Sequence, residues 1–264
     1  MNSTKKLRGL VSLAVGGTAL ALSSQAGFAQ EEPEFDEAQI YFELNDTDGD
    51  LGIHGFIDGD AWRSLEIEGP DENELMNVWL RTGLRRQGLT EFFFESEEPD
   101  FDELSPKAFL NRFKPGIYEI EAVSLEGEEF EEEVRVSHVL AGPAGNITVN
   151  GQPGAESCDS EDLPVVSGSA TIDWDPVTMS HPTIGTPNVA VTVKQYQFIC
   201  EIEREGRTPE EIVVAVDLPR NRTRFTCPAE FTALSLDGEV KYEIITKLTN
   251  NNQTSVESCF ELED

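Results

Sequence analysis

The sequence predicts an all-β protein of two tandem β-sandwich domains, the first of which carries one short helix. Short runs of alternating apolar and polar residues, such as "QIYFELN" and "GIYEIEAVS", recur along the chain, and this alternation is typical of strands with one buried face. Turn-forming sequences such as "DG" and "GPDE" separate the runs, which favours antiparallel strands. The segment 141–164 is rich in Gly, Pro, Asn and Ser and divides the chain into two modules.

The first 29 residues have the features of a secretory signal peptide. A basic stretch precedes a short apolar run, and Gly27 and Ala29 supply the small residues at the −3 and −1 positions of a cleavage site. The apolar run is too short for a comfortable membrane-spanning helix. We therefore expect residues 1–29 to direct export and to be removed, which leaves a secreted or periplasmic protein without a transmembrane segment.

The chain is strongly acidic, with a formal net charge of −32. Such a surface repels nucleic acids and anionic lipids, so we expect neither as a partner. The acidity is greater in the first module than in the second. We expect an acidic leader at 30–37, an acidic β-sandwich domain at 38–140, a linker at 141–161 and a second sandwich domain at 162–264.

In the first module, alternation gives each expected strand a buried face. The turn Asp58-Gly59-Asp60 is expected to end the second strand. One segment differs, because "SPKAFLNRF" (105–113) begins with Ser-Pro and spaces its apolar residues as a short helix does. The residues expected to face the core in the first two strands are Ile40, Phe42 and Leu44, then Leu51, Ile53 and Ile57.

The loop "LNDTDGDL" between these two strands is the best candidate for chemistry. Asp46, Asp48 and Asp50 stand where an EF-hand loop has its first three side-chain ligands. However, Leu51 stands where that loop needs Gly, and Ile57 where it needs Glu. A solvent-exposed hairpin turn is the preferred interpretation, and calcium binding by the three aspartates is the alternative. No other cofactor is expected.

No pattern in the sequence predicts catalysis. His54, His138 and His181 lie in separate segments, and no nucleophile elbow, zinc-protease motif or phosphate loop is present. The run "EFFFE" (91–95) and Trp79 could form an exposed aromatic surface, but strand periodicity favours Phe92 and Phe94 in the core. We therefore expect a protein that is not an enzyme.

All the cysteines, which are Cys158, Cys200, Cys227 and Cys259, lie in the second half of the chain. An even number in an exported chain indicates two disulfides. None of the spacings is C-x-x-C, which argues against a zinc or redox motif. Three pairings are possible from the sequence alone.

The second module carries several motifs of one fold family. Trp174 lies in "ATIDWDPVT" and Tyr196 in "VKQYQFICEIE", while Leu236 precedes Tyr242 by six residues in "LSLDGEVKYEIITKL". In this order and at these spacings, residues 162–264 resemble a fibronectin type III domain. The resemblance implies an immunoglobulin-like sandwich with Trp174, Tyr196 and Tyr242 in its core. It also implies that Leu236 and Tyr242 form the corner in which the tyrosine hydroxyl bonds to loop backbone.

The same resemblance suggests a disulfide pairing. It places Cys200 and Cys227 on inward faces of strands in opposite sheets, so that a Cys200–Cys227 bridge would cross the core. Cys158 and Cys259 then remain, near the first strand and in the last strand of the domain, and would form the second bridge.

These features together predict a non-enzymatic exported protein that acts as a binder or spacer at the cell surface or in the periplasm. Its partner would be a protein or a polysaccharide. The main alternative is a calcium-dependent carbohydrate- or protein-binding module that uses Asp46, Asp48 and Asp50. A polysaccharide-acting enzyme with its site in the first module is a more distant alternative.

Overall fold

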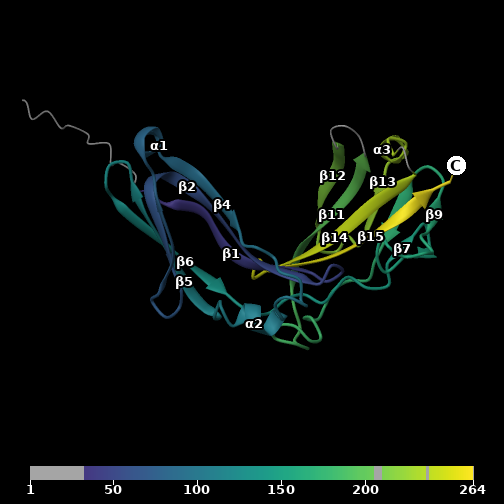
Figure 1. The fold of residues 1–264 in the computed structure, drawn as a ribbon, viewed down its shortest axis with the longest axis horizontal. Coiled ribbons are helices and arrows are strands. Elements are labelled where there is room, and N and C mark those ends of the chain that lie inside the picture. The colour runs from purple at the N-terminus through teal and green to yellow at the C-terminus, as the bar shows by residue number, and fades with distance from the viewer. Residues whose placement is uncertain (1–32, 205–209, 236–237, 264) are drawn as a thin grey trace, which may run out of the picture. The chain divides into compact units, whose positions relative to one another are not determined.

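The computed structural model describes residues 33–204, 210–235 and 238–263 (Figure 1). The expected signal peptide lies outside the described residues, as do residues 30–32 of the expected acidic leader, whose last residues, 35–37, belong to the first strand. The all-β prediction is confirmed, because strands dominate the described chain and its helices are all short.

The first half of the chain contains six strands and two helices in the described residues. They are β1 (Phe35–Asn45), β2 (Asp50–Glu68), β3 (Glu74–Trp79), α1 (Thr82–Gln87), β4 (Leu89–Glu95), α2 (Pro106–Leu110), β5 (Gly116–Ser124) and β6 (Glu129–Val136). The second half contains β7 (Thr148–Val149), β8 (Gln152–Pro153), β9 (Val165–Val166), β10 (Ala170–Asp173), β11 (Val193–Arg204), β12 (Glu210–Pro219), β13 (Arg224–Cys227), α3 (Ala229–Thr232), β14 (Glu239–Leu248) and β15 (Gln253–Leu262).

Strands β1 and β2 form the expected antiparallel hairpin. Asn45 pairs with Asp50, so Asp46–Gly49 make the connecting turn. The predicted inward residues of both strands are almost fully buried. Alternation therefore set the faces of these strands correctly, because a shift of one residue would have moved every apolar side chain to the other face.

The turn expected at Asp58-Gly59-Asp60 is wrong. The chain continues through it as strand β2, which pairs with β1 and β4 in its first part and with β3 and β5 in its second part. A Cβ on Gly59 would lie 2.6 Å from the carbonyl oxygen of Glu34. The glycine thus allows the backbones of the two strands to lie close together at a register shift of the β1–β2 pair. Glycine in a strand often marks such a close approach, as well as being common in turns.

The first half has its own hydrophobic core. Side chains of β1 and the first part of β2 face those of the second part of β2, β5 and β6, and the rings of Phe35 and Phe130 lie 4.6 Å apart. The predicted helix is present as α2, where the hydroxyl of Ser105 accepts a hydrogen bond from the Ala108 amide. Its Phe109 and Leu110 are buried in this core. Helix α1 has six residues and no buried side chain.

The second half forms the predicted sandwich, and Figure 1 shows β11, β12, β14 and β15 side by side. One sheet has the order β12-β11-β14-β15, and the other has the order β13-β10-β7-β8. If β7, β10, β11, β12, β13, β14 and β15 are read as A, B, C, C′, E, F and G, these are the A-B-E and C′-C-F-G sheets of a fibronectin type III sandwich.

The two sheets enclose a second hydrophobic core. The ring of Trp174 stacks on Phe198 at 5.8 Å and meets Tyr196 edge to face at 5.5 Å. Tyr196 also accepts a hydrogen bond from the Val177 amide through its hydroxyl. Trp174, Tyr196 and Tyr242 are therefore core residues.

The stretch 141–161, which we expected to be a linker, contributes to this sandwich. It contains β7 and β8, and β7 pairs with β10 through Val149 opposite Ile172. Val149 is fully buried. The Gly- and Pro-rich composition there marks the hairpin between β7 and β8 instead of an unpaired connection.

Strand β1 of the first half pairs in parallel with β15 of the second, with Glu43 opposite Gln253. One sheet therefore continues from one half into the other, although each half has a separate hydrophobic core. Contacts group Pro33–Asp264 as one unit. The division into two tandem domains stays a prediction.

Candidate functional site

The three aspartates at the β1–β2 turn, two within it and Asp50 at the start of β2, have different surroundings. Asp46 Oδ1 lies 2.8 Å from His181 Nε2, and Asp48 accepts a hydrogen bond from the side chain of Asn45 at 3.0 Å. Partial burial and the nearby carboxylate of Glu98 raise the pKa of Asp50 to about 6. Among the described residues, these aspartates do not form a group whose oxygens converge as metal ligands do.

The aromatic residues of the run 91–95 divide between the core and the solvent as expected. Phe92 and Phe94 pack partly buried against the first core, as the strand period predicts. Phe93, between them, is 51% exposed, and Trp79 on β3 is 57% exposed. The first half therefore presents the side chains of Phe93 and Trp79 to solvent. Packing of the hydrophobic core does not account for their positions, because neither side chain is buried in it.

Trp79 borders a groove on the sheet of β2, β3, β5 and β6. The groove has a volume of about 300 Å³. It is lined by the carboxylates of Glu66, Glu121, Glu129 and Glu131 and by no Lys or Arg. Partial desolvation, then repulsion from Glu74 and Glu68, raises the pKa of Glu66. The groove combines one exposed indole with unneutralised negative charge, which suits a cationic ligand.

A second polar centre surrounds His54 on the outward face of β2. Its ring is only 5% exposed and lies between the rings of Tyr41 and Phe93. His54 Nε2 lies 2.8 Å from Glu98 Oε1, and its Nδ1 lies 3.9 Å from Glu43 Oε2. Strand pairing places His54 opposite Glu95. One buried imidazole thus faces carboxylates on both sides.

The backbone around His54 is arranged to admit Glu98. A Cβ on Gly52 would lie 2.0 Å from Glu98 Oε1, so the carboxylate occupies the space that any other residue would fill. Ser96 fixes the chain beyond β4, since its hydroxyl accepts the Ile53 amide at 3.0 Å and its own amide donates to the Ile53 carbonyl. The glycine and the serine together hold Glu98 over β2.

Two groups of described residues have donor atoms close enough to hold a metal ion. In each group these atoms lie within 4.8 Å of one another. The groups are His54, Glu95 and Glu98, and Glu119, Glu121 and Glu131. Only the first contains an imidazole and a buried ligand.

No spacing along the chain predicts that His54, Glu95 and Glu98 lie together. His54 and Glu98 are 44 positions apart, and the pairing of β2 with β4 brings them together. A glycine two residues before the histidine was the one local signal, since Gly in a strand often marks a close approach.

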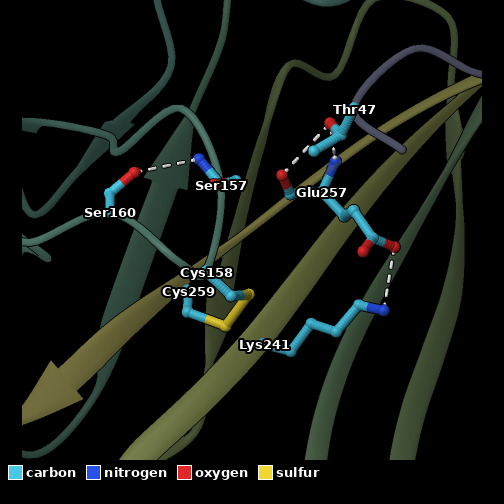
Figure 2. The surroundings of a disulfide bond; sticks show 7 residues. All are labelled: Thr47, Ser157, Cys158, Ser160, Lys241, Glu257 and Cys259. Carbon is cyan, nitrogen blue, oxygen red and sulfur yellow. Dashed lines mark hydrogen bonds and ion pairs between the residues drawn. A yellow bond between two sulfur atoms is a disulfide. The ribbon is translucent and has the colours of Figure 1, made fainter. Parts of the chain in front are cut away.

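Both disulfides link the pairs that the resemblance suggested, Cys200–Cys227 and Cys158–Cys259. Figure 2 shows the second, which joins the segment after β8 to strand β15. Nearby, Glu257 of β15 forms an ion pair with Lys241 at 2.8 Å and exchanges two hydrogen bonds with Thr47 through its backbone. The hydrogen bonds between Thr47 and Glu257 therefore hold the β1–β2 turn to strand β15 of the second half.

Leu236, one partner of the predicted tyrosine corner, lies outside the described residues. The hydroxyl of Tyr242 lies 2.9 Å from where a Cβ on Gly154 would stand. The corner itself therefore stays a prediction.

In the part of the chain that the structure describes, no helix is long and apolar enough to span a membrane. No family model matches the sequence, and no curated protein matches it.

Solved structures with similar folds are fibronectin type III, immunoglobulin-like and adhesin-repeat proteins. One is the tetra-tandem repeat in the extending region of a large adhesion protein, with 10% identity and a TM-score of 0.26, covering 86% of this chain and 50% of that one. Another is the FN1–FN3 segment of chicken CNTN1, with 8% identity and a TM-score of 0.33, covering 87% and 68%. This chain thus spans half the length of the adhesion structure. The fold assignment rests on the strand order described above.

Proposed function

We propose that this chain is an exported, non-enzymatic binding protein that holds a cationic segment of a partner protein in the groove beside Trp79. Two disulfides and no free cysteine in the described chain fit an oxidising compartment. The leader-like sequence of residues 1–29 supports export to the periplasm or cell surface.

The observation that carries the proposal is the exposed indole of Trp79 within a carboxylate-lined groove. A Lys or Arg side chain over an indole gains a cation–π interaction of about 0.5–1 kcal/mol at an exposed site. Carboxylates such as those of Glu121 and Glu131 would pair with neighbouring cations of the same segment. Their Coulomb attraction would also steer a cationic partner toward the acidic protein.

The joined sheet supports a spacer role for the second half. The pairing of β1 with β15 and the contact of Asp46 with His181 connect the two halves by main-chain and side-chain bonds. The fibronectin type III-like half would then act as a spacer, which holds the groove of the first half away from the surface to which the protein is attached.

Binding of a fluorescent hexalysine peptide, followed by anisotropy at low and high salt, tests the proposal. We expect saturable binding that weakens with salt. Trp79→Ala should weaken it about two- to fivefold, as should the double substitution Glu121→Gln and Glu131→Gln. Phe93→Ala is the matched control, because Phe93 is equally exposed but does not line the groove.

Absence of saturable binding, or equal affinity of the Trp79→Ala variant, would contradict the proposal. A neutral oligosaccharide array is the second arm of the experiment. Binding there that needs Trp79, without peptide binding, would replace the cationic protein partner by a saccharide. Cleavage of an oligosaccharide that Glu121→Gln abolishes would show an enzyme and overturn the non-enzymatic assignment.

A further inference from the structure

We propose that His54, Glu95 and Glu98 form a binding site for a divalent transition-metal ion of the Zn²⁺ type. This site shares no residue with the groove beside Trp79, and it is independent of the proposed binding of a cationic partner. It also differs from the calcium site that the sequence suggested at Asp46, Asp48 and Asp50.

The donor atoms already lie close to the required arrangement. One ring nitrogen of His54 and one carboxylate oxygen each of Glu95 and Glu98 fall within 4.8 Å of one another. Two ligands at about 2.1 Å from a zinc ion are roughly 3.4 Å apart in a tetrahedral site. The two glutamates have long, flexible side chains, so rotations about their χ angles would bring the three atoms together. The backbone of β2 would not have to move.

The histidine provides the observation that separates this centre from an ordinary acidic cluster. His54 is almost fully buried, and its Nε2 lies 2.8 Å from the carboxylate of Glu98. Its Nδ1 makes no hydrogen bond among the described residues, although Glu43 stands 3.9 Å away on that side. Metal-bound histidines commonly carry a carboxylate next to the ring nitrogen that does not bind the ion. In this arrangement Glu43 would hold the Nδ1 hydrogen and orient Nε2 toward the ion.

The surrounding chain is shaped to keep Glu98 in place. Gly52 leaves open the space that the Glu98 carboxylate fills, and Ser96 ties the segment before Glu98 to β2 through two hydrogen bonds with Ile53. A carboxylate at a flexible surface position would need neither feature. These contacts reduce the entropy that metal binding would otherwise lose.

The local charge also favours a dication. The carboxylates of Glu43, Glu95 and Glu98 converge on one imidazole, so their negative charges repel one another. A doubly charged ion would neutralise this repulsion. An imidazole with carboxylates fits Zn²⁺ better than Ca²⁺ or Mg²⁺, which prefer oxygen ligands alone.

Calorimetric titration of the full chain with Zn²⁺, after treatment with chelator, tests the site. We expect binding of one ion at this centre, and at least a tenfold loss of affinity in both Glu95→Gln and Glu98→Gln. These substitutions keep side-chain size, and neither side chain is buried. Glu97→Gln is the matched control, because Glu97 is an exposed carboxylate next to Glu98 that belongs to neither group of candidate ligands. It should leave the affinity unchanged.

The ¹⁵N resonances of the histidine rings report whether Zn²⁺ binds directly to His54. A purely structural role of His54 would leave these resonances unchanged when Zn²⁺ is added. Added Zn²⁺ should shift the Nε2 signal of His54 and leave those of His138 and His181 in place, while Ca²⁺ and Mg²⁺ at the same concentration should shift none. The proposal is overturned if Zn²⁺ does not bind, if it shifts only the other histidines, or if Glu98→Gln binds as tightly as the unsubstituted protein.

Discussion

His181 donates a hydrogen bond from Nε2 to Asp46 Oδ1 over 2.8 Å. The direction is fixed by the other ring nitrogen, because Nδ1 accepts the amide of Ile184 at 2.8 Å and that of Thr183 at 3.2 Å. With Nδ1 acting as acceptor, the hydrogen of a neutral ring must be on Nε2. Residues 135 positions apart in the sequence are thus joined, and the turn that suggested calcium binding has a structural role between the two halves.

Asp46→Ala should destabilise the protein by about 1–3 kcal/mol, because it leaves the buried Nε2 hydrogen of His181 without an acceptor. Asp46→Asn should cost less, since the amide oxygen can still accept. Urea unfolding measures both. Asp48→Ala is the control and should cost about 0.5 kcal/mol or less, because Asp48 is exposed and bonds only to Asn45. Equal losses for Asp46→Ala and Asp48→Ala would remove the role assigned to His181.

Glu243 predicts how stability depends on pH. Burial, followed by repulsion from Glu257 on the paired strand, raises the pKa of Glu243 to about 7, well above its ordinary value of 4.5. The folded state therefore binds a proton more tightly than the unfolded state. The free energy of unfolding should rise as pH falls through about 7 toward 4.5, and should drop again as pH is raised.

Glu243→Gln removes the charge that burial disfavours. We expect this variant to be more stable than the unsubstituted protein by about 2 kcal/mol at pH 8 and to lose most of the advantage near pH 5. Thermal or urea unfolding across this range measures the difference. Glu261→Gln, at an exposed position of β15, should change the pH profile little. A Glu243→Gln variant that is less stable at pH 8 would contradict the assignment.

The sequence was informative wherever a local pattern determined the structure. Alternation identified the buried faces of β1 and β2, Ser105 and Pro106 marked the start of α2, and the motifs around Trp174 and Tyr196 indicated the second sandwich. It failed where distant strands decide the outcome. His54 and Glu98 meet only because β2 pairs with β4 in one register, and no spacing along the chain encodes that register.

Removal of the Cys158–Cys259 bridge should destabilise the protein strongly. The bridge joins residues 101 positions apart, and the loss of loop-closure entropy in the unfolded chain predicts about 4.7 kcal/mol. Urea unfolding of the double variant Cys158→Ala, Cys259→Ala measures this cost. The segment before Ser160 should also become sensitive to proteases, because the bridge holds it to β15 (Figure 2).

The bridge between Cys200 and Cys227 spans only 27 positions, and the same entropy estimate gives about 3.5 kcal/mol for it. Both of its cysteines are fully buried, whereas the other bridge joins the buried Cys259 to the half-buried Cys158, so replacement of Cys200 and Cys227 adds the larger packing cost. Limited proteolysis distinguishes the two variants. Only loss of the Cys158–Cys259 bridge should expose the segment before Ser160, and cleavage there in both variants would show that the bridge does not anchor it.

Gly59 and Gly83 form a matched pair that tests the continuous course of β2. Gly59→Ala would place a methyl group 2.6 Å from the carbonyl oxygen of Glu34 and 2.8 Å from Phe35 Cα. Because both neighbours are backbone atoms, the strands must separate, and we expect a loss of about 1–3 kcal/mol in urea unfolding. Gly83→Ala lies in helix α1 and meets no atom within 4 Å, so it should stabilise the protein by about 0.5–1 kcal/mol. A tight turn at Asp58-Gly59-Asp60 would hold Gly59 away from Glu34, and Gly59→Ala would then not show this loss.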